Sequence, residues 1–179
     1  MSESIRYTLG GMARLENLLG VQALAVVDRM TEDDLAPSET AALVTLLAHP
    51  GSGVGWLADV LGLTDSGGTR VVERLVAAGL LERRPGSDAR SRVLQLTDLG
   101  RLRAEAALST RERELANALE PLCDAERQTL ERLLHKIVAR LADDRPTALH
   151  VCRMCDREAC AAGEGRCPLE HTVPPGGLP

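Results

Sequence analysis

The stretch GWLADVLGLTDSGGTRVVERLVAAGLLERRPGSDARSRVLQLTDLG, from Gly55 to Gly100, decides the fold. A short apolar helical segment ends at Gly62, and a second helix begins after the capping residues Thr64 and Asp65. Gly79 ends that helix, and two short β-prone runs then flank a loop of turn-forming residues. This order predicts a winged helix-turn-helix, so double-stranded DNA is the first partner to test.

The polar face of the second helix and the loop of the wing supply the candidate DNA contacts. We expect the helix to meet the major groove and its phosphates, and the wing to reach the narrow minor groove, which favours arginine. The predicted DNA-binding residues are Ser66, Thr69, Arg70 and Arg74 on the helix, Asp88 and Arg90 at the wing tip, and Arg84 and Arg92 nearer the wing base.

Gly67 and Gly68 stand inside the second helix, where two glycines lower helix propensity by roughly 2 kcal/mol relative to alanine. Two explanations stay open. The glycines permit a close approach to phosphates, or the first turn of the helix is loose until DNA orders it.

The charge distribution agrees with DNA binding although the net charge is -5. Between Arg70 and Arg92 six arginines face three acidic residues, which gives a local balance of +3. Lys136 is the only lysine among 21 basic residues, and arginine offers a planar fork for phosphates and guanine edges. One Trp, one Tyr and no Phe argue against a stacking platform for single strands and weaken the case for an aromatic-lined pocket.

Apolar residues at spacings of three and four predict further helices on both sides of this stretch. They run from about residue 5 to 30, from Pro37 to about His49, from Thr97 to about Leu119 and from Asp124 to about Leu141. We expect Ser38 to cap the second of these, Asp124 to cap the last, and His49 to act as a cation at the end of the second. No run approaches ~18 apolar residues and no signal peptide is visible, so we expect a cytoplasmic protein without a membrane partner.

Four cysteines follow the last predicted helix with the spacing C-x2-C-x4-C-x6-C: Cys152, Cys155, Cys160 and Cys167. Clustered thiols in a reducing compartment indicate a metal site. Three interpretations stay open. An iron–sulfur cluster suits closely spaced thiolates with a proline after the last, structural zinc usually uses two separated cysteine pairs, and redox-active thiols need no metal. His150 and His171 flank the set, and either is able to replace a thiol as ligand or to be a bystander.

Four segments carry a family resemblance: Leu57-Ala58-Asp59-Val60-Leu61-Gly62-Leu63, Val72-Glu73-Arg74-Leu75, Gly79-Leu80-Leu81-Glu82-Arg83, and Asp88-x-Arg90 leading to Leu96-Thr97-x-x-Gly100. With them, the chain resembles the MarR family of dimeric winged-helix regulators over roughly residues 5 to 144. The resemblance implies a homodimer held by N- and C-terminal helices on a near-palindromic operator. Likeness to compact four-cysteine sets in bacterial regulators favours [4Fe-4S] over [2Fe-2S].

We therefore expect a mainly α fold with a small β-wing, with a winged-helix and dimerisation domain over residues 1–145 and a metal-binding tail over residues 146–179. The expected function is transcriptional regulation, as a repressor, that responds to an iron–sulfur cluster. A regulator that senses a small molecule, with structural Zn²⁺ in its tail, is the alternative within this class. An iron–sulfur electron carrier or redox enzyme is the alternative outside it, but no nucleophile elbow, Walker loop or HExxH is present, so we do not expect an enzyme.

Overall fold

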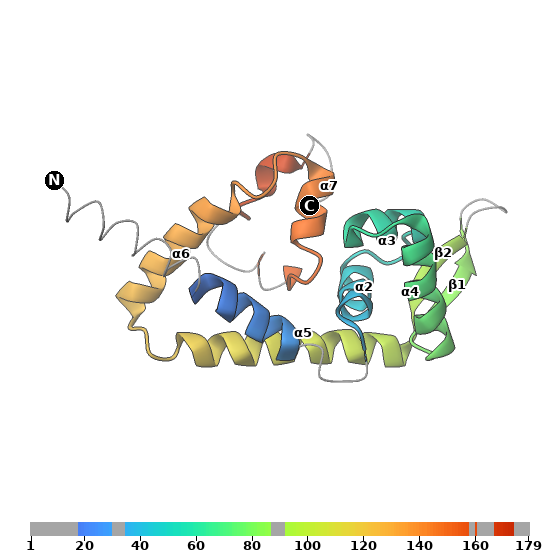
Figure 1. The fold of residues 1–179 in the computed structure, drawn as a ribbon, viewed down its shortest axis with the longest axis horizontal. Coiled ribbons are helices and arrows are strands. Elements are labelled where there is room, and N and C mark those ends of the chain that lie inside the picture. The colour runs from blue at the N-terminus through green and yellow to red at the C-terminus, as the bar shows by residue number, and fades with distance from the viewer. Residues whose placement is uncertain (1–17, 30–34, 87–91, 158–159, 161–166, 174–179) are drawn as a thin grey trace.

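The computed structural model describes residues 18–29, 35–86, 92–157, 160 and 167–173 (Figure 1). Residues 18–29 are helical, whereas residues 5–17 of the predicted first helix lie outside the described part. The mainly helical fold with a two-stranded wing is confirmed. The remaining elements are α2 (Pro37–Ala48), α3 (Val54–Leu61), α4 (Asp65–Ala77), β1 (Leu81–Pro85), β2 (Arg92–Leu96), α5 (Asp98–Leu119), α6 (Asp124–Val138), α7 (Arg145–Val151) and the 3-10 turn η1 (Glu170–Thr172).

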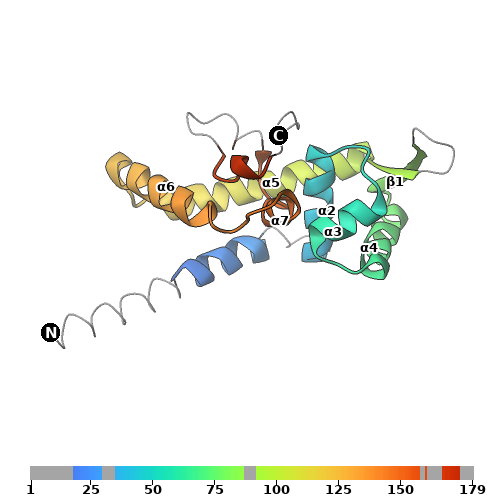
Figure 2. The same cartoon turned by 90° about the horizontal axis from the view of Figure 1, so that it is seen from above.

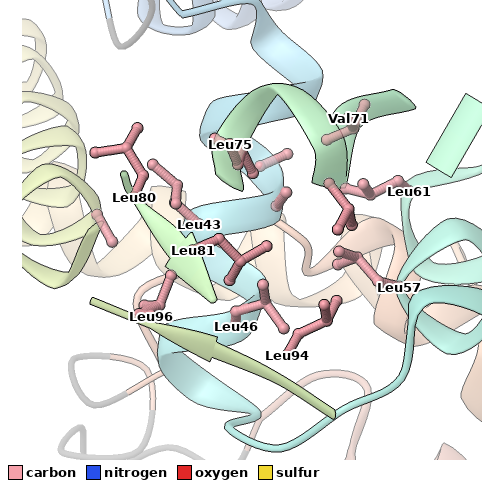
Figure 3. Packing of buried hydrophobic residues seen from close by; sticks show 14 residues of the cluster. Leu43, Leu46, Leu57, Leu61, Val71, Leu75, Leu80, Leu81, Leu94 and Leu96 are labelled. Atoms are coloured by element: carbon pink, nitrogen blue, oxygen red, sulfur yellow. The ribbon is translucent and has the colours of Figure 1, made fainter. Parts of the chain in front are cut away.

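Helices α2, α3 and α4 and the wing form one lobe around an aliphatic core (Figure 3). The strands β1 and β2 are antiparallel, with Leu81 opposite Leu96. Side chains alternate along a strand, so Leu81, Leu94 and Leu96 all face the core. Leucine and valine fill the interior where phenylalanine is absent, and each such buried side chain stabilises the fold by roughly 2 kcal/mol. The largest fully buried side chains of the lobe are Leu43, Leu46, Leu57, Leu75, Leu81, Leu94, Val44 and Val72.

The start of α5 is tied to the turn before the wing. Thr97 is the predicted N-cap, and its hydroxyl accepts a hydrogen bond from Gly100 N at 3.0 Å and donates one to Gly79 O at 2.7 Å. A Cβ at Gly100 would lie 1.9 Å from Leu80 O, so only glycine fits this position. The motif Leu96-Thr97-x-x-Gly100 therefore fixes how the long helix leaves the lobe.

Helices α5 and α6 and residues 18–29 form an arm that extends away from the lobe (Figures 1 and 2). Val26 packs beside Ala107 of α5. No residue of α6 is buried, and its apolar side chains Leu133 and Ile137 are 46% and 48% exposed, while Leu141, just past the end of the helix, is 51% exposed. The spacing of four places Leu133 and Ile137 on one face of the helix, which nothing in the described part of the chain covers.

Helix α7 folds back from the end of α6 and packs against α3 (Figures 1 and 2). Leu169 is buried against Ala142 and Ala148, and His171 Nε2 lies 3.0 Å from Ala142 O. The turn η1 therefore brings the end of the cysteine-containing segment back to Ala142 and Ala148, where the segment begins. The division of the chain at residue 145 stays a prediction, although the first part of the tail packs on the lobe.

Two helix starts differ from the predicted ones. The N-cap of α2 is Ala36 rather than Ser38, because Pro37 occupies the first helical position and fixes its backbone angle there. Glu39 Oε2 then accepts a hydrogen bond from Ala36 N at 2.8 Å. The N-cap of α6 is likewise Cys123, whose N–H donates to Glu126 Oε2 at 2.9 Å. Among the described residues, no helix has the length and apolar content that crossing a membrane requires.

Candidate DNA-binding face and cysteine cluster

The predicted helix-turn-helix consists of α3, a turn and α4. Gly62 ends α3 with a φ of +67°, in the left-handed region that favours glycine. Leu63 N donates to Ala58 O at 2.9 Å, which closes the turn. The Thr64 hydroxyl accepts a hydrogen bond from Gly67 N at 3.2 Å and caps α4 as predicted. These local bonds set the angle at which α4 leaves the turn.

Gly68 has a packing role that neither sequence-based explanation included. It is buried at the crossing of α3 and α4, where a Cβ would lie 2.5 Å from the Cβ of Ala58. The helix α4 begins at Asp65, and Gly67 and Gly68 both lie within its first turns. Gly68 is therefore required because the two helices approach more closely than a methyl group allows.

The polar face of α4 presents three of the predicted DNA-binding residues together. Ser66 and Arg70 are exposed and Thr69 is half-buried, while Val71, Val72 and Leu75 face the core. Ser66 Oγ lies 3.2 Å from Thr64 Oγ1, in the first turn of the helix. The N-terminal half of α4 thus offers hydroxyl and guanidinium groups on one open surface.

Arg74 has a structural partner that the sequence did not reveal. Its Nε forms an ion pair with Oε1 of Glu39, whose side chain is only 8% exposed, whereas the Arg74 side chain is 55% exposed. The other Glu39 oxygen holds the start of α2. Arg74 therefore joins α4 to α2, and its remaining N–H groups stay on the surface.

The wing presents arginines on both of its faces. Arg84 Nε and Nη2 donate to Oε1 of Glu82 at 3.0 and 2.6 Å. Arg92 is exposed opposite Pro85, and the strand alternation puts it on the other face from Arg84. Asp88 and Arg90, the predicted tip contacts, lie outside the described residues.

The four tail cysteines lie together as free thiols. Cys155 Sγ donates to Asp156 O at 3.5 Å, and the four side chains lie close enough for each thiol to influence the pKa of a neighbour. Over the described residues, no three His, Cys, Asp or Glu side chains form a group with the geometry of a metal site. The thiols are therefore neighbours, but they do not surround one position at which a metal ion would be bound.

The thiols influence one another's ionisation. A hydrogen bond from Cys155 lowers the pKa of Cys152 from its ordinary value of 9.0 to about 7. The same hydrogen bond raises the pKa of Cys155 well above its usual range, with burial adding to the effect. Burial, together with the charge of Cys155, raises the pKa of Cys160 to about 11. Repulsion and burial thus keep most of the cluster protonated.

Two arginines outside the predicted site lie near the cysteines. The charge of Arg157 favours the Cys152 thiolate, and the charge of Arg111 favours the Cys155 thiolate. Arg157 belongs to the tail, whereas Arg111 lies on α5. The charged residues beside Arg111 in the sequence predict only a solvent-exposed helix face. No sequence signal pointed to Arg111, since only the folding of the tail over α5 brings it there. Both arginines would offset the negative charge of a thiolate-bound metal.

The two flanking histidines have hydrogen-bond partners already. His150 Nδ1 lies 2.9 Å from Val60 O, and its Nε2 is 3.5 Å from Nη1 of Arg153. His171 Nδ1 lies 3.1 Å from Pro168 O, and its Nε2 contacts Ala142 O. Both ring nitrogens of each histidine are engaged, which favours structural roles over metal ligation.

His49 differs from its expected role as a cation. Burial, together with the charges of Arg157 and Arg145, lowers the pKa of His49 from 6.5 to about 4. Its ring packs against Trp56 with the centroids 5.1 Å apart. His49 is therefore a neutral packing residue at the end of α2.

Residues 33–91, from just before α2 to the wing tip, match a family model described as "MarR family". No curated protein matches the chain.

Solved structures share the wider fold. A MarR family protein from Bacillus stearothermophilus is 28% identical, with a TM-score of 0.62 over 76% of this chain and 95% of its own. RV1404 from Mycobacterium tuberculosis is 26% identical, with a TM-score of 0.62 over 78% and 96%. YusO from Bacillus subtilis, at 21% identity, is similar in fold, with a TM-score of 0.65 over 78% and 99%. The helix-turn-helix and the first strand of the wing thus lie in a segment that is similar to the MarR family, and the chain as a whole shares the fold of a MarR family protein.

Proposed function

We propose that the protein is a homodimeric repressor whose affinity for a near-palindromic operator responds to a metal centre held by Cys152, Cys155, Cys160 and Cys167. The observation that supports the proposal is the proximity of four free thiols to one another and to Arg111 and Arg157. The ligands of such a metal are thiolates, so metal binding would displace the thiol protons. An iron–sulfur cluster, [4Fe-4S] in preference to [2Fe-2S], is the proposed occupant, because the spacing wraps four thiolates in one loop.

The DNA contacts follow from the open surface of α4 and from the wing. Ser66, Thr69 and Arg70 would meet the major groove, while the exposed part of Arg74 would reach a phosphate. Asp88, Arg90, Arg84 and Arg92 would contact DNA from the wing. The exposed apolar faces of α6 and of residues 18–29 supply the surface for the second subunit. Two recognition helices in such a dimer lie about 34–36 Å apart, one turn of the operator.

DNA binding is tested with labelled operator fragments at several salt concentrations. Arg70→Ala and Arg90→Ala should each weaken binding by about 1–3 kcal/mol. Arg101→Ala, on the exposed surface of α5, is the matched control that removes the same charge elsewhere. An unchanged binding isotherm for Arg70→Ala at fixed salt would remove that residue from the interface.

The metal centre is tested on protein purified without oxygen. Visible absorption with stoichiometric iron and sulfide is expected, and stripping the iron should change DNA affinity. Cys155→Ser should lose the metal, whereas Cys123→Ser, an exposed cysteine at the start of α6, should keep it. Colourless protein with stoichiometric zinc would replace the iron–sulfur assignment with structural zinc. Equal affinity of the loaded and stripped forms would end the sensor proposal.

A further inference from the structure

We infer that the cysteine centre acts on the helix-turn-helix by direct contact within one subunit, through His150, Arg153 and Met154. The inference rests on the metal centre proposed above, and it names the route from that centre to α4. The alternative is a route through the arm formed by α5, α6 and residues 18–29, because the tail follows α6 directly. The described contacts favour the route through the lobe.

His150 connects α7 to the turn of the helix-turn-helix. Arginine only donates hydrogen bonds and a carbonyl only accepts them, so the His150 proton lies on Nδ1, which donates to Val60 O at 2.9 Å. Val60 is in the last turn of α3, where helix carbonyls lack partners within the helix. The imidazole also covers Gly62, where a Cβ would lie 2.9 Å from His150 Cε1. Thr64, the N-cap of α4, is two residues further on.

The two residues between Cys152 and Cys155 are themselves anchored to the lobe. The Arg153 carbonyl accepts a hydrogen bond of 3.1 Å from the hydroxyl of Thr45, a buried residue of α2. Arg153 Nη1 also donates to His150 O at 2.8 Å. Met154 packs against the core of the lobe and against the second cluster that contains Val44 and Ala107.

These anchors would couple the metal centre to the lobe once Cys152 and Cys155 share a ligand. Both thiolates would have to turn toward one metal, and the only backbone between them belongs to Arg153 and Met154. Loading or loss of the metal would thus shift the contacts with Thr45 and His150. His150 would pass this shift to Val60 and Gly62, and so to the angle between α3 and α4.

The experiment compares two histidines that anchor the same tail at different places. His150→Ala removes the contact with α3, and His171→Ala removes the contact with Ala142 at the end of the dimer arm. Each full-length protein is loaded with ferrous iron and sulfide, or with Zn²⁺, and then stripped with a chelator. Metal content, circular dichroism and the operator dissociation constants of both forms are measured. The readout is the ratio of the two dissociation constants.

We expect a ratio of roughly 5 to 150 for the wild type, the usual range of allosteric coupling. His150→Ala should keep full metal content and helicity while its ratio falls to within twofold of 1, and His171→Ala should keep the wild-type ratio. Thr45→Val, which removes only the hydroxyl that holds Arg153 O, should lower the ratio in the same direction.

The opposite pattern, with the ratio lost in His171→Ala and kept in His150→Ala, would overturn the inference in favour of the arm and leave the sensor intact. Full coupling in all three variants would also overturn the inference and leave the sensor intact. A wild-type ratio of 1, or no bound metal, would overturn the proposed sensor and this route together.

Discussion

Gly68 of α4 lies against Ala58 of α3 so closely that a Cβ at position 68 would come within 2.5 Å of the Ala58 Cβ. The distance between the two helices of the DNA-binding motif therefore depends on the absence of one methyl group. The neighbouring Gly67 meets only Thr64 Oγ1 at 3.2 Å and Leu63 Cβ at 3.4 Å.

The two glycines should respond to alanine in opposite directions. Gly68→Ala is expected to lower the free energy of unfolding by about 1–3 kcal/mol, because an extra methyl in a packed crossing forces the backbone apart. Gly67→Ala should leave stability unchanged or raise it by up to about 1 kcal/mol through helix propensity. Urea unfolding followed by circular dichroism measures both. Equal stability of the two variants would contradict the close approach at Gly68.

The main effect of removing Arg74 should be a lower free energy of unfolding rather than a lower affinity for DNA. Arg74→Ala leaves the nearly buried Glu39 carboxylate without its ion-pair partner, a loss of about 1–3 kcal/mol. The double variant Glu39→Gln, Arg74→Ala should recover part of this loss, since the amide carries no charge to stabilise. A thermodynamic cycle of the four proteins measures the coupling. Additive effects in that cycle would make the ion pair irrelevant to stability.

His49 should make the fold sensitive to moderate acid. Its pKa of about 4 lies below its ordinary value of 6.5, so the unfolded chain takes up the proton first as the pH falls. Stability is therefore unaffected above pH 6.5 and declines from there toward pH 4. At ~1.36 kcal/mol per pKa unit the full shift corresponds to about 3 kcal/mol, and partial solvation of the ring reduces the expected loss to about 1 kcal/mol.

His49→Asn isolates this contribution from those of the carboxylates. The free energy of unfolding of the wild type should fall more between pH 7 and pH 4.5 than that of the variant. A variant with the same pH dependence as the wild type would show that His49 titrates normally in the native state.

The apolar face of α6 should control assembly. Ile137→Glu places a charge in the middle of this exposed stripe and is expected to shift the protein toward monomer and to weaken operator binding at least tenfold, because two half-sites are no longer bound together. Sedimentation velocity measures the mass. Gln128→Glu adds a charge on the opposite side of the same helix and should leave the dimer intact. A dimeric Ile137→Glu protein would place the interface elsewhere.

Local signals made the helix-turn-helix and wing predictable from sequence. Gly62, Thr64 and Gly79 act within a few residues of themselves, so their spacing alone located the turn and both ends of α4. Contacts between distant residues gave no such signal. Glu39 and Arg74 are 35 residues apart, and His150 is 90 residues from Val60. The sequence shows Gly68 as an exception to helix propensity, but the need for glycine there comes from its contact with Ala58 on α3.

The cysteine spacing identified the thiol cluster, but it did not reveal the cluster's surroundings. Arg111 resembled any charged residue of a solvated helix, and only the return of the tail over α5 gives it a role. His150 and His171 were indistinguishable in sequence as flanking histidines. Their partners differ because one faces the lobe and the other faces the end of the arm.

The contact between His171 and Ala142, with Leu169 buried beside Ala148, closes the cysteine segment at its base without any ligand. Closing a flexible loop of roughly 30 residues lowers chain entropy by about 3 kcal/mol at 25 °C. In this protein folding has already met that entropic penalty, so an ion at the proposed metal centre would only have to draw neighbouring thiols together. The aliphatic and imidazole groups at the base would thus raise the affinity of the proposed site without touching the ion.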